Sequence, residues 1–359
     1  MYKFSIFASV LMAGGAALAQ TSAQNSTATP TNTAEKVLNI YSARHYPTDE
    51  ALYSNFTKTT GITINRVDAD DAGILARLRA EGSASPADVI LLVDAARLWR
   101  GETEGLFQPV KSRLLMNAIP EQLRGKSTPD GGASWFGFSS RARVIVYDKL
   151  QVKKENVDTY EKLGEPQNAG KLCIRSGSHP YNLSLFGSVL EHLGEAKTQD
   201  WLKGMVSNMA RPPKGGDTDQ IKGVASGECG IAVTNTYYMA RILRSDKAED
   251  RAIADRVSVV FPNQNSWGTH VNVAGGAMAK NAKNPANAVK FLEYLASPSA
   301  QEHFANGNNE WPIAKGVTIS NPALQAMSGG NFKRETVPVS VIGMNQIKVQ
   351  QMLDRVGFR

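Results

Sequence analysis

The sequence predicts an α/β protein of two lobes, on three observations. Short apolar runs with strand character alternate with longer helical runs along most of the chain, which is typical of βαβ units and mostly parallel sheets. The chain has 359 residues, 42% of them hydrophobic, and at about 100–200 residues per domain this length favours two domains. Two further stretches have the character of crossings between lobes: the apolar run 141–147, and the run 257–261 followed by a polar turn and residues 269–274.

Each predicted strand is followed by a helix. The pairs are 37–42 with 49–59, 88–93 with 95–102, 171–175 with 182–193, and 229–234 with 238–243. Another helix is predicted at 286–295, where Pro285 suits the first helical position. Because the chain crosses twice, we expect a first lobe of residues 37–139 and 264–312 and a second lobe of residues 140–263 and 313–359. A ligand cleft is expected between the two lobes.

The N-terminal sequence predicts export. Lys3 precedes an apolar run that ends with the small-residue pattern Ala17–Leu18–Ala19, so residues 1–19 are predicted to be a signal peptide. Residues 20–36 carry little apolar surface and are predicted to form a disordered leader. No later run approaches the ~20 apolar residues of a membrane helix. We therefore expect a monomer in the periplasm with no membrane span in the mature chain.

The charge of the chain does not indicate a nucleic-acid partner. The net charge is +7 and the isoelectric point about 9.3, but the basic residues are scattered and form no stripe interleaved with aromatic residues. Cys173 and Cys229 are the only cysteines. An even count in an oxidising compartment favours one disulfide over a metal pair, and two unpaired buried thiols are the alternative.

Tyrosines stand where three of the predicted strands give way to helices. Tyr46, Tyr181 and the pair Tyr237 and Tyr238 each follow a different strand. Ligands bind at the carboxyl ends of strands in open α/β sheets, and helix N-termini there favour negative charge. A phenol has a pKa of about 10, so ionising several phenols at neutral pH requires a strong cation nearby. Hard trivalent metal ions prefer oxygen ligands and drive their deprotonation, and Fe³⁺ is the natural match.

Each of these residues also has a structural interpretation. A single tyrosine, or one adjacent pair, is more often an interior residue whose hydroxyl finds a partner. Only the recurrence of tyrosine at three strand–helix junctions, called corners below, favours a metal. His45 is equally compatible with an iron ligand and with a surface histidine. Arg44, Arg175 and Arg241 are candidates to offset phenolate charge and donate hydrogen bonds around the metal ligands, although each alone is more typical of a solvated arginine. Asp94 is predicted to be a helix N-cap.

The sequence resembles the periplasmic ferric iron-binding proteins of bacterial iron ABC transporters, especially the multi-tyrosine type of cyanobacteria and Campylobacter. The resemblance extends from about Leu38 to near Val317. It rests on segments 41–49, 85–99, 105–110, 135–144, 173–176, 181–182, 227–229, 235–238 and 268–271.

The resemblance implies a type II periplasmic binding protein fold, in which two doubly wound α/β lobes joined by crossover strands close over Fe³⁺. By position, Tyr46 would come from the first lobe and Tyr181, Tyr237 and Tyr238 from the second. The implied partner is an inner-membrane ABC permease, and an anion such as carbonate is a candidate for completing the coordination. His179 departs from the family pattern, and we leave open whether it is a ligand, a hydrogen-bond partner or neither.

Two other functions are alternatives to iron binding. The same fold could bind a polyamine, thiamine, an anion or a sugar, but organic cations usually require carboxylates and an aromatic box, whereas phenols and arginines suit a hard metal. A secreted hydrolase could use Ser176, Ser178 and His179. However, no Gly-x-Ser-x-Gly, Ser-x-x-Lys or His-Glu-x-x-His motif is present, so we do not expect an enzyme.

Overall fold

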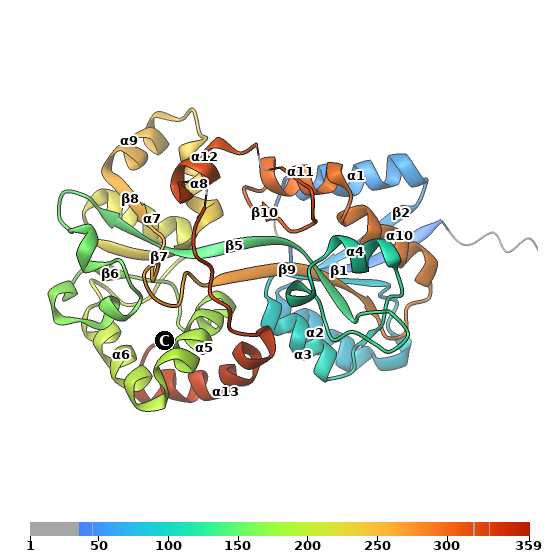
Figure 1. Cartoon of the computed structure of the whole chain (residues 1–359), viewed down its shortest axis with the longest axis horizontal. Coiled ribbons are helices and arrows are strands. Elements are labelled where there is room, and N and C mark those ends of the chain that lie inside the picture. The colour runs from blue at the N-terminus through green and yellow to red at the C-terminus, as the bar shows by residue number, and fades with distance from the viewer. Residues whose placement is uncertain (1–35, 45, 319, 330) are drawn as a thin grey trace, which may run out of the picture. The chain divides into compact units, whose positions relative to one another are not determined.

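The computed structural model describes residues 36–44, 46–318, 320–329 and 331–359 (Figure 1). The predicted signal peptide and all of the predicted leader except Lys36 lie outside these ranges, as does His45. None of the helices in the described ranges combines the length and apolar character that a bilayer crossing requires.

Ten strands and thirteen α-helices make up the described part of the chain. The strands are β1 (Val37–Ser42), β2 (Thr63–Asp68), β3 (Val89–Leu92), β4 (Phe107–Gln108), β5 (Trp135–Asp148), β6 (Leu172–Cys173), β7 (Ile231–Asn235), β8 (Val257–Val260), β9 (Val271–Ala279) and β10 (Trp311–Pro312). The helices are α1 (Asp49–Thr60), α2 (Asp71–Glu81), α3 (Ala95–Thr103), α4 (Arg113–Ala118), α5 (Pro180–Leu193), α6 (Glu195–Ser207), α7 (Asp217–Ser226), α8 (Thr236–Leu243), α9 (Ala248–Arg256), α10 (Pro285–Leu295), α11 (Pro298–Asn306), α12 (Pro322–Ser328) and α13 (Val339–Val356).

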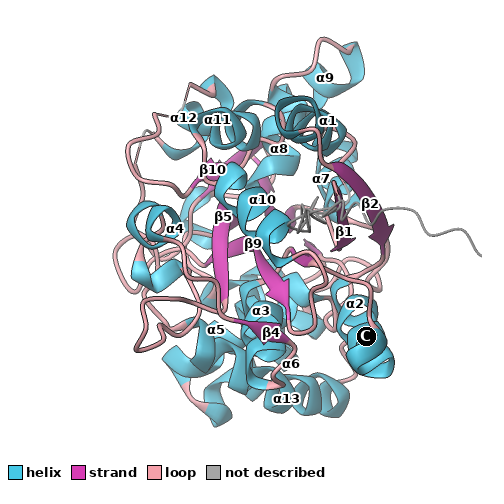
Figure 2. Cartoon of the chain, turned by 90° about the vertical axis from the view of Figure 1, so that its right-hand side faces the viewer, coloured by secondary structure: helices cyan, strands magenta, loops and turns pink. Residues whose placement is uncertain are grey.

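The strands form a mixed sheet with the order β2-β1-β3-β9-β5-β7-β6. Parallel pairs lie at both ends of this order, where β1 pairs with β2 and β3, and β6 pairs with β7. In the middle, β5 and β9 pair antiparallel with each other and with their other neighbours. The predicted parallel pairing therefore describes the two ends of the sheet, and the crossing strands run against it. Helices lie on both sides of the strands (Figure 2).

β5 is the strand that connects the two lobes. Its first half, from Trp135 to Ala142, pairs with β9, and its second half, from Arg143 to Asp148, pairs with β7 and β8. All of its residues are buried. Figure 1 shows β5 and β9 passing between two groups of helices. The predicted crossing at 141–147 lies within β5.

Each group of helices covers its own hydrophobic core. One core contains Leu38 and Ile40 of β1 with Phe56 of α1 and Phe291 of α10. A second core is built from different segments, and its members include Ile145, Val233, Phe186, Leu202 and Leu353. These two clusters are accompanied by three smaller ones in the described part of the chain. They fit the predicted pair of lobes, and the segment boundaries of the lobes stay a prediction.

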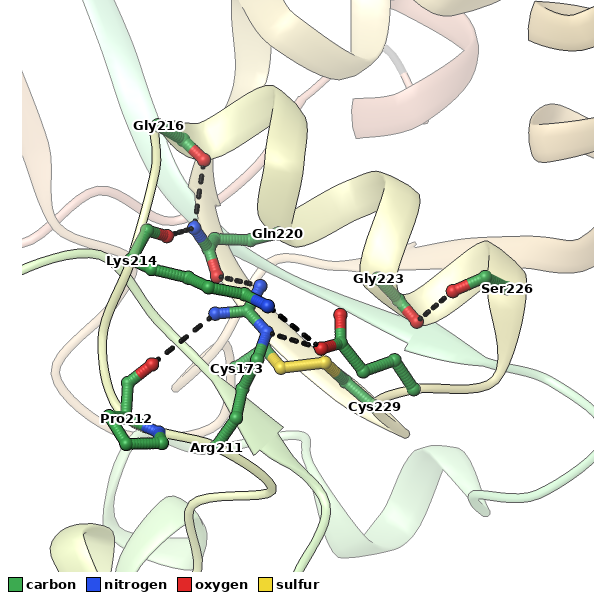
Figure 3. The surroundings of a disulfide bond; sticks show 10 residues. Cys173, Arg211, Pro212, Lys214, Gly216, Gln220, Gly223, Ser226 and Cys229 are labelled. Carbon is green, nitrogen blue, oxygen red and sulfur yellow. Dashed lines mark hydrogen bonds and ion pairs between the residues drawn. A yellow bond between two sulfur atoms is a disulfide. The ribbon is translucent and has the colours of Figure 1, made fainter.

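A disulfide joins Cys173 at the end of β6 to Cys229 just before β7, with the two Cα atoms 5.8 Å apart (Figure 3). The predicted disulfide is therefore confirmed. β6 and β7 are parallel neighbours, and Cys173 is opposite Ala232. Arg211 lies beside the bridge (Figure 3), and its Nε atom is 3.0 Å from the Glu228 carboxylate.

Replacing both cysteines with alanine should lower the stability of the protein. The bridged cysteines are 56 positions apart in the sequence, and restricting the unfolded chain by a loop of this length stabilises the fold by about 4 kcal/mol. Alanine is preferred to serine because both sites are buried and a hydroxyl would need a partner there. Urea unfolding followed by circular dichroism measures the change. A loss below about 1 kcal/mol would contradict the loop-closure argument.

Candidate metal-binding site

The fold places each predicted tyrosine at the start of a helix. Tyr46 lies between β1 and α1, and its carbonyl accepts a hydrogen bond from the backbone N–H of Asp49 at 2.9 Å. Tyr181 is the second residue of α5. α8 begins at Thr236, two residues earlier than predicted, so Tyr237 and Tyr238 lie in its first turn.

The four tyrosine side chains meet in one cluster. The hydroxyl of Tyr237 donates a hydrogen bond to the hydroxyl oxygen of Tyr181 at 3.3 Å. The rings of Tyr46 and Tyr237 pack edge to face with their centroids 5.4 Å apart, and the rings of Tyr237 and Tyr238 are 4.2 Å apart. Three of the tyrosines are buried and Tyr238 is partly exposed. Three corners that are far apart in the sequence therefore bring their phenol groups together.

Arg141 of β5 contributes a buried positive charge to the cluster. Its guanidinium lies 5.7 Å from the ring centre of Tyr181, and its Nε atom is 3.6 Å from Oε1 of Glu310. Its three side-chain nitrogens have no hydrogen-bond partner among the described residues. Burial alone lowers the pKa of Arg141, but the charges of Glu310 and of the phenolates that Tyr46 and Tyr181 can form outweigh it and raise the pKa.

Glu310 is a buried carboxylate that the sequence analysis did not identify. Its Oε1 accepts a hydrogen bond from the hydroxyl of Tyr46 at 3.2 Å, and its Oε2 accepts one from Ser139 at 2.8 Å. Arg44 also reaches Oε2 at 3.5 Å. No motif marks this position, because Glu310 belongs to a polar segment 264 residues from Tyr46.

The surroundings keep the phenols protonated. Burial is the main cause that raises the pKa of Tyr46 and Tyr237 well above the usual value of 10.0. Burial likewise raises the pKa of Tyr181 to about 12, although Arg141 opposes the shift. The three buried phenols can therefore lose their protons near neutral pH only to a strongly charged cation.

The predicted arginines lie near the tyrosine rings. Arg44 lies over the ring of Tyr46 at 4.9 Å and forms an ion pair with Asp49 at 2.6 Å. Two others approach second-lobe tyrosines, with Arg175 5.3 Å from the ring centre of Tyr181 and Arg241 5.8 Å from that of Tyr238.

Of the two candidate histidines, the structure describes only His179. His179 caps α5, because its Nδ1 accepts a hydrogen bond from the backbone N–H of Tyr181 at 3.3 Å. His45 lies outside the described residues, and its role as a ligand stays a prediction. Asp94 caps α3 as predicted, since its Oδ1 accepts from the N–H of Arg97 at 3.0 Å.

The phenol oxygens of the cluster are the candidate donors for a metal ion. Within the described ranges, no group of three or more His, Cys, Asp or Glu side chains is arranged to hold a metal. A cavity of about 890 Å³ reaches the cluster, and both Tyr46 and Tyr181 line it. The same cavity is lined by the charged groups Arg44, Asp49 and Arg97.

Comparison with known proteins identifies the family. The sequence profile of the bacterial extracellular solute-binding proteins matches residues 51–326. The chain belongs to this family. Iron uptake protein A1 of Synechocystis is 45% identical to this solute-binding protein over 325 residues, which is 90% of this chain and 88% of the relative. Iron uptake protein A2 of the same organism is 43% identical over 326 residues, 90% of each chain.

Solved structures of similar proteins agree with this family. Trichodesmium IdiA (FutA), described in complex with iron and citrate ligands, is 48% identical to this solute-binding protein. The two structures superpose with a TM-score of 0.80 over 90% of this chain and 100% of the Trichodesmium chain. The ferric binding protein from Campylobacter jejuni is 37% identical with a TM-score of 0.84 at the same coverage. The predicted family and the predicted two-lobed α/β fold are therefore confirmed.

The metal-free solute-binding protein should ionise Tyr181 only at high pH. The folded pKa of about 12 lies above the usual 10.0, so the folded state holds this proton more tightly than the unfolded state does. The resulting stabilisation is complete below about pH 10 and is lost as the pH rises towards about 12. The difference between the ultraviolet phenolate titrations of the wild type and Tyr181→Phe isolates this group. A midpoint near 10 in that difference would contradict the burial argument.

Proposed function

We propose that this protein captures Fe³⁺ as cargo between its lobes, through the phenolate oxygens of Tyr46, Tyr181, Tyr237 and Tyr238. The convergence of these four side chains from three strand–helix corners carries the proposal, together with the 3.3 Å contact between the hydroxyls of Tyr181 and Tyr237. Hard trivalent ions favour oxygen donors, and the relatives that resemble the chain over most of its length are iron uptake and ferric binding proteins.

Iron must displace protons from the site. The buried phenols hold their protons strongly, so each phenolate forms only as the ion arrives and the proton leaves. The affinity for Fe³⁺ therefore rises with pH. Tyr46 must also exchange its hydrogen bond with Glu310 for a bond to the ion. Protonation, or reduction to Fe²⁺, weakens the phenolate bonds and favours release.

The binding sequence follows from the positions of the tyrosines. The second lobe supplies Tyr181, Tyr237 and Tyr238, so the ion meets this lobe first in the open protein. Closure then brings Tyr46 to the ion, and His45 beside it is a candidate fifth ligand. Because the ion makes more bonds in the closed form, it shifts the population towards closure.

Cargo binding of this kind belongs to a carrier rather than an enzyme. We place the protein in the periplasm after removal of residues 1–19, as a monomer that delivers Fe³⁺ to an inner-membrane ABC permease. The family of extracellular solute-binding proteins supports this placement.

An anion such as carbonate is proposed to complete the coordination beside Arg141. The buried guanidinium of Arg141 has hydrogen-bond donors with no partner among the described residues. Guanidinium groups bind oxyanions through paired N–H donors. An anion bound there would place its oxygens next to the phenol cluster.

Adding a ferric salt to the purified protein should produce a visible phenolate-to-iron charge-transfer band. Replacing Tyr237 and Tyr238 together with phenylalanine should abolish most of the band and weaken binding at least roughly 10-fold, since ligands matter no less than their supporting residues. The matched control is Tyr294→Phe, whose hydroxyl bonds the carbonyl of Leu52 at 3.0 Å in another part of the fold. A colourless wild type, or a band that survives the double substitution, would end the proposal.

The anion proposal predicts that carbonate tightens iron binding by the wild type and that Arg141→Met loses most of this response. Titrations with Fe³⁺ in carbonate-free and carbonate-containing buffer, at one pH, provide the comparison. Equal affinities of the wild type in both buffers would exclude a contribution from carbonate while leaving the tyrosine site untouched.

A further inference from the structure

One buried carboxylate lies between the two second-lobe corners that carry the tyrosines. Asp217 is the first residue of α7 and is fully buried. Its Oδ2 accepts hydrogen bonds from Nη1 of Arg143 and, at 2.8 Å, from the backbone N–H of Asn235. Its Oδ1 accepts from Nη1 of Arg175 at 3.3 Å. A single side chain thus accepts from three donors, on β5, on β7 and in the loop between β6 and α5.

The bond to Asn235 holds the corner that carries Tyr237 and Tyr238. Asn235 is the last residue of β7 and the residue before α8. Its backbone N–H donates directly to Asp217, and its side-chain Oδ1 accepts from Arg143 at 3.3 Å. The direction in which α8 leaves the sheet is therefore fixed next to the tyrosine pair.

The bonds to Arg143 and Arg175 hold the corner that carries Tyr181. Nη2 of Arg143 donates to Oδ1 of Asn182 at 2.8 Å, and Asn182 adjoins Tyr181. The amide of Asn182 in turn donates to the carbonyls of Arg175 at 3.1 Å and of Ser176 at 3.0 Å. The turn between β6 and α5 is therefore tied to the same carboxylate.

We propose that Asp217 is a positioning residue that fixes the spacing between Tyr181 and the pair Tyr237 and Tyr238 and thereby sets the geometry of iron binding. The proposal rests on the iron-binding function proposed above. Asp217 acts through Arg143, Asn182 and the backbone of Asn235, without touching the ion.

The disulfide does not duplicate the hydrogen bonds by which Asp217 connects the two corners. Cys173 and Cys229 join the two strands eight residues before Tyr181 and Tyr237, respectively. Asp217 instead acts where β7 ends and α8 begins, two residues from Tyr237. The bridge holds the strands together, and the carboxylate holds the corners that the strands lead into.

The charge of Asp217 is as important as its shape. The side chain of Arg143 is 1% exposed and that of Arg175 is 15% exposed, and both face this carboxylate. Removing the negative charge leaves two guanidiniums in one buried network without their shared partner. Asparagine also replaces one acceptor oxygen with a donor, so at least one of the three bonds is lost.

The test compares Asp217→Asn with Asp148→Asn. Asp148 is a matched control, because it is also a buried carboxylate paired with an arginine, Arg256 at 2.6 Å, and it lies at the far end of β5 from the tyrosines. We expect Asp217→Asn to weaken Fe³⁺ binding roughly 10–100-fold, as for residues that support metal ligands, and to shift the charge-transfer band. Asp148→Asn should lower the melting temperature without changing affinity or band, and Asp217→Glu, which keeps the charge, should recover part of the affinity.

Two results would overturn the proposal. One is an Asp217→Asn protein with wild-type affinity and an unshifted band. The other is an equal loss of iron binding in Asp148→Asn at an equal loss of stability. If Asp217→Asn does not fold, Asn182→Ala tests the positioning role instead. This variant leaves the three bonds of Asp217 intact and releases only the corner that carries Tyr181. Wild-type iron binding by Asn182→Ala would then reject the positioning role.

Hydrogen exchange separates this proposal from the function on which it rests. In the metal-free protein, Asp217→Asn should speed amide exchange at residues 175–182 and 235–238 relative to Asp148→Asn. If the wild type gives no iron band, the proposed iron-binding function is wrong. The exchange rates still test whether Asp217 holds the two corners together. If the wild type binds iron and Asp217→Asn shows unchanged exchange and unchanged affinity, only the positioning role of Asp217 is wrong.

Discussion

The arrangement of the site depends on one constraint, which is that a buried phenol keeps its proton unless a strong cation lies beside it. Burial raises the pKa of Tyr46, Tyr181 and Tyr237, and Arg141 alone does not reverse the shift. A cluster of such phenols therefore discriminates by charge, because a weakly charged ligand cannot displace the protons. Under the proposed iron binding, the same burial weakens the cluster for most ligands and favours a hard trivalent ion.

The crossing strand β5 supplies both charges around which the cluster is organised. Arg141 and Arg143 are two residues apart, so on a strand they face the same side of the sheet. Arg141 reaches the phenols and Glu310, whereas Arg143 reaches Asp217 and Asn182. Because one half of β5 pairs with β9 and the other half with β7, Arg141 and Arg143 lie where this strand passes from one group of strands to the other.

Local sequence predicts the tyrosine corners well but not the groups that support them. The strand–helix pairs follow from hydrophobic periodicity, and helices such as α1, α5 and α10 begin within about two residues of where the pattern places them. Tyr46, Tyr181 and Tyr237 are marked by their position in these pairs. Glu310 and Asp217 carry no such mark, since Glu310 bonds Tyr46 264 residues away and Asp217 bonds Arg143 74 residues away. The antiparallel pairing of β5 and β9 was missed for the same reason, because strand direction is set by the return of the chain between lobes.

In the proposed iron binding, Glu310 makes coordination by Tyr46 an exchange of partners. The hydroxyl of Tyr46 donates to Glu310 at 3.2 Å, so the ion gains only the difference between a phenolate bond and this hydrogen bond. Glu310 keeps Ser139 and Arg44 as partners, so losing Tyr46 does not leave it as an isolated buried charge. When a proton returns to Tyr46, the carboxylate is in place to accept the hydrogen bond again. In the proposed release, Tyr46 therefore returns to Glu310 as the lobes open, and the ion stays with the three tyrosines of the proposed second lobe.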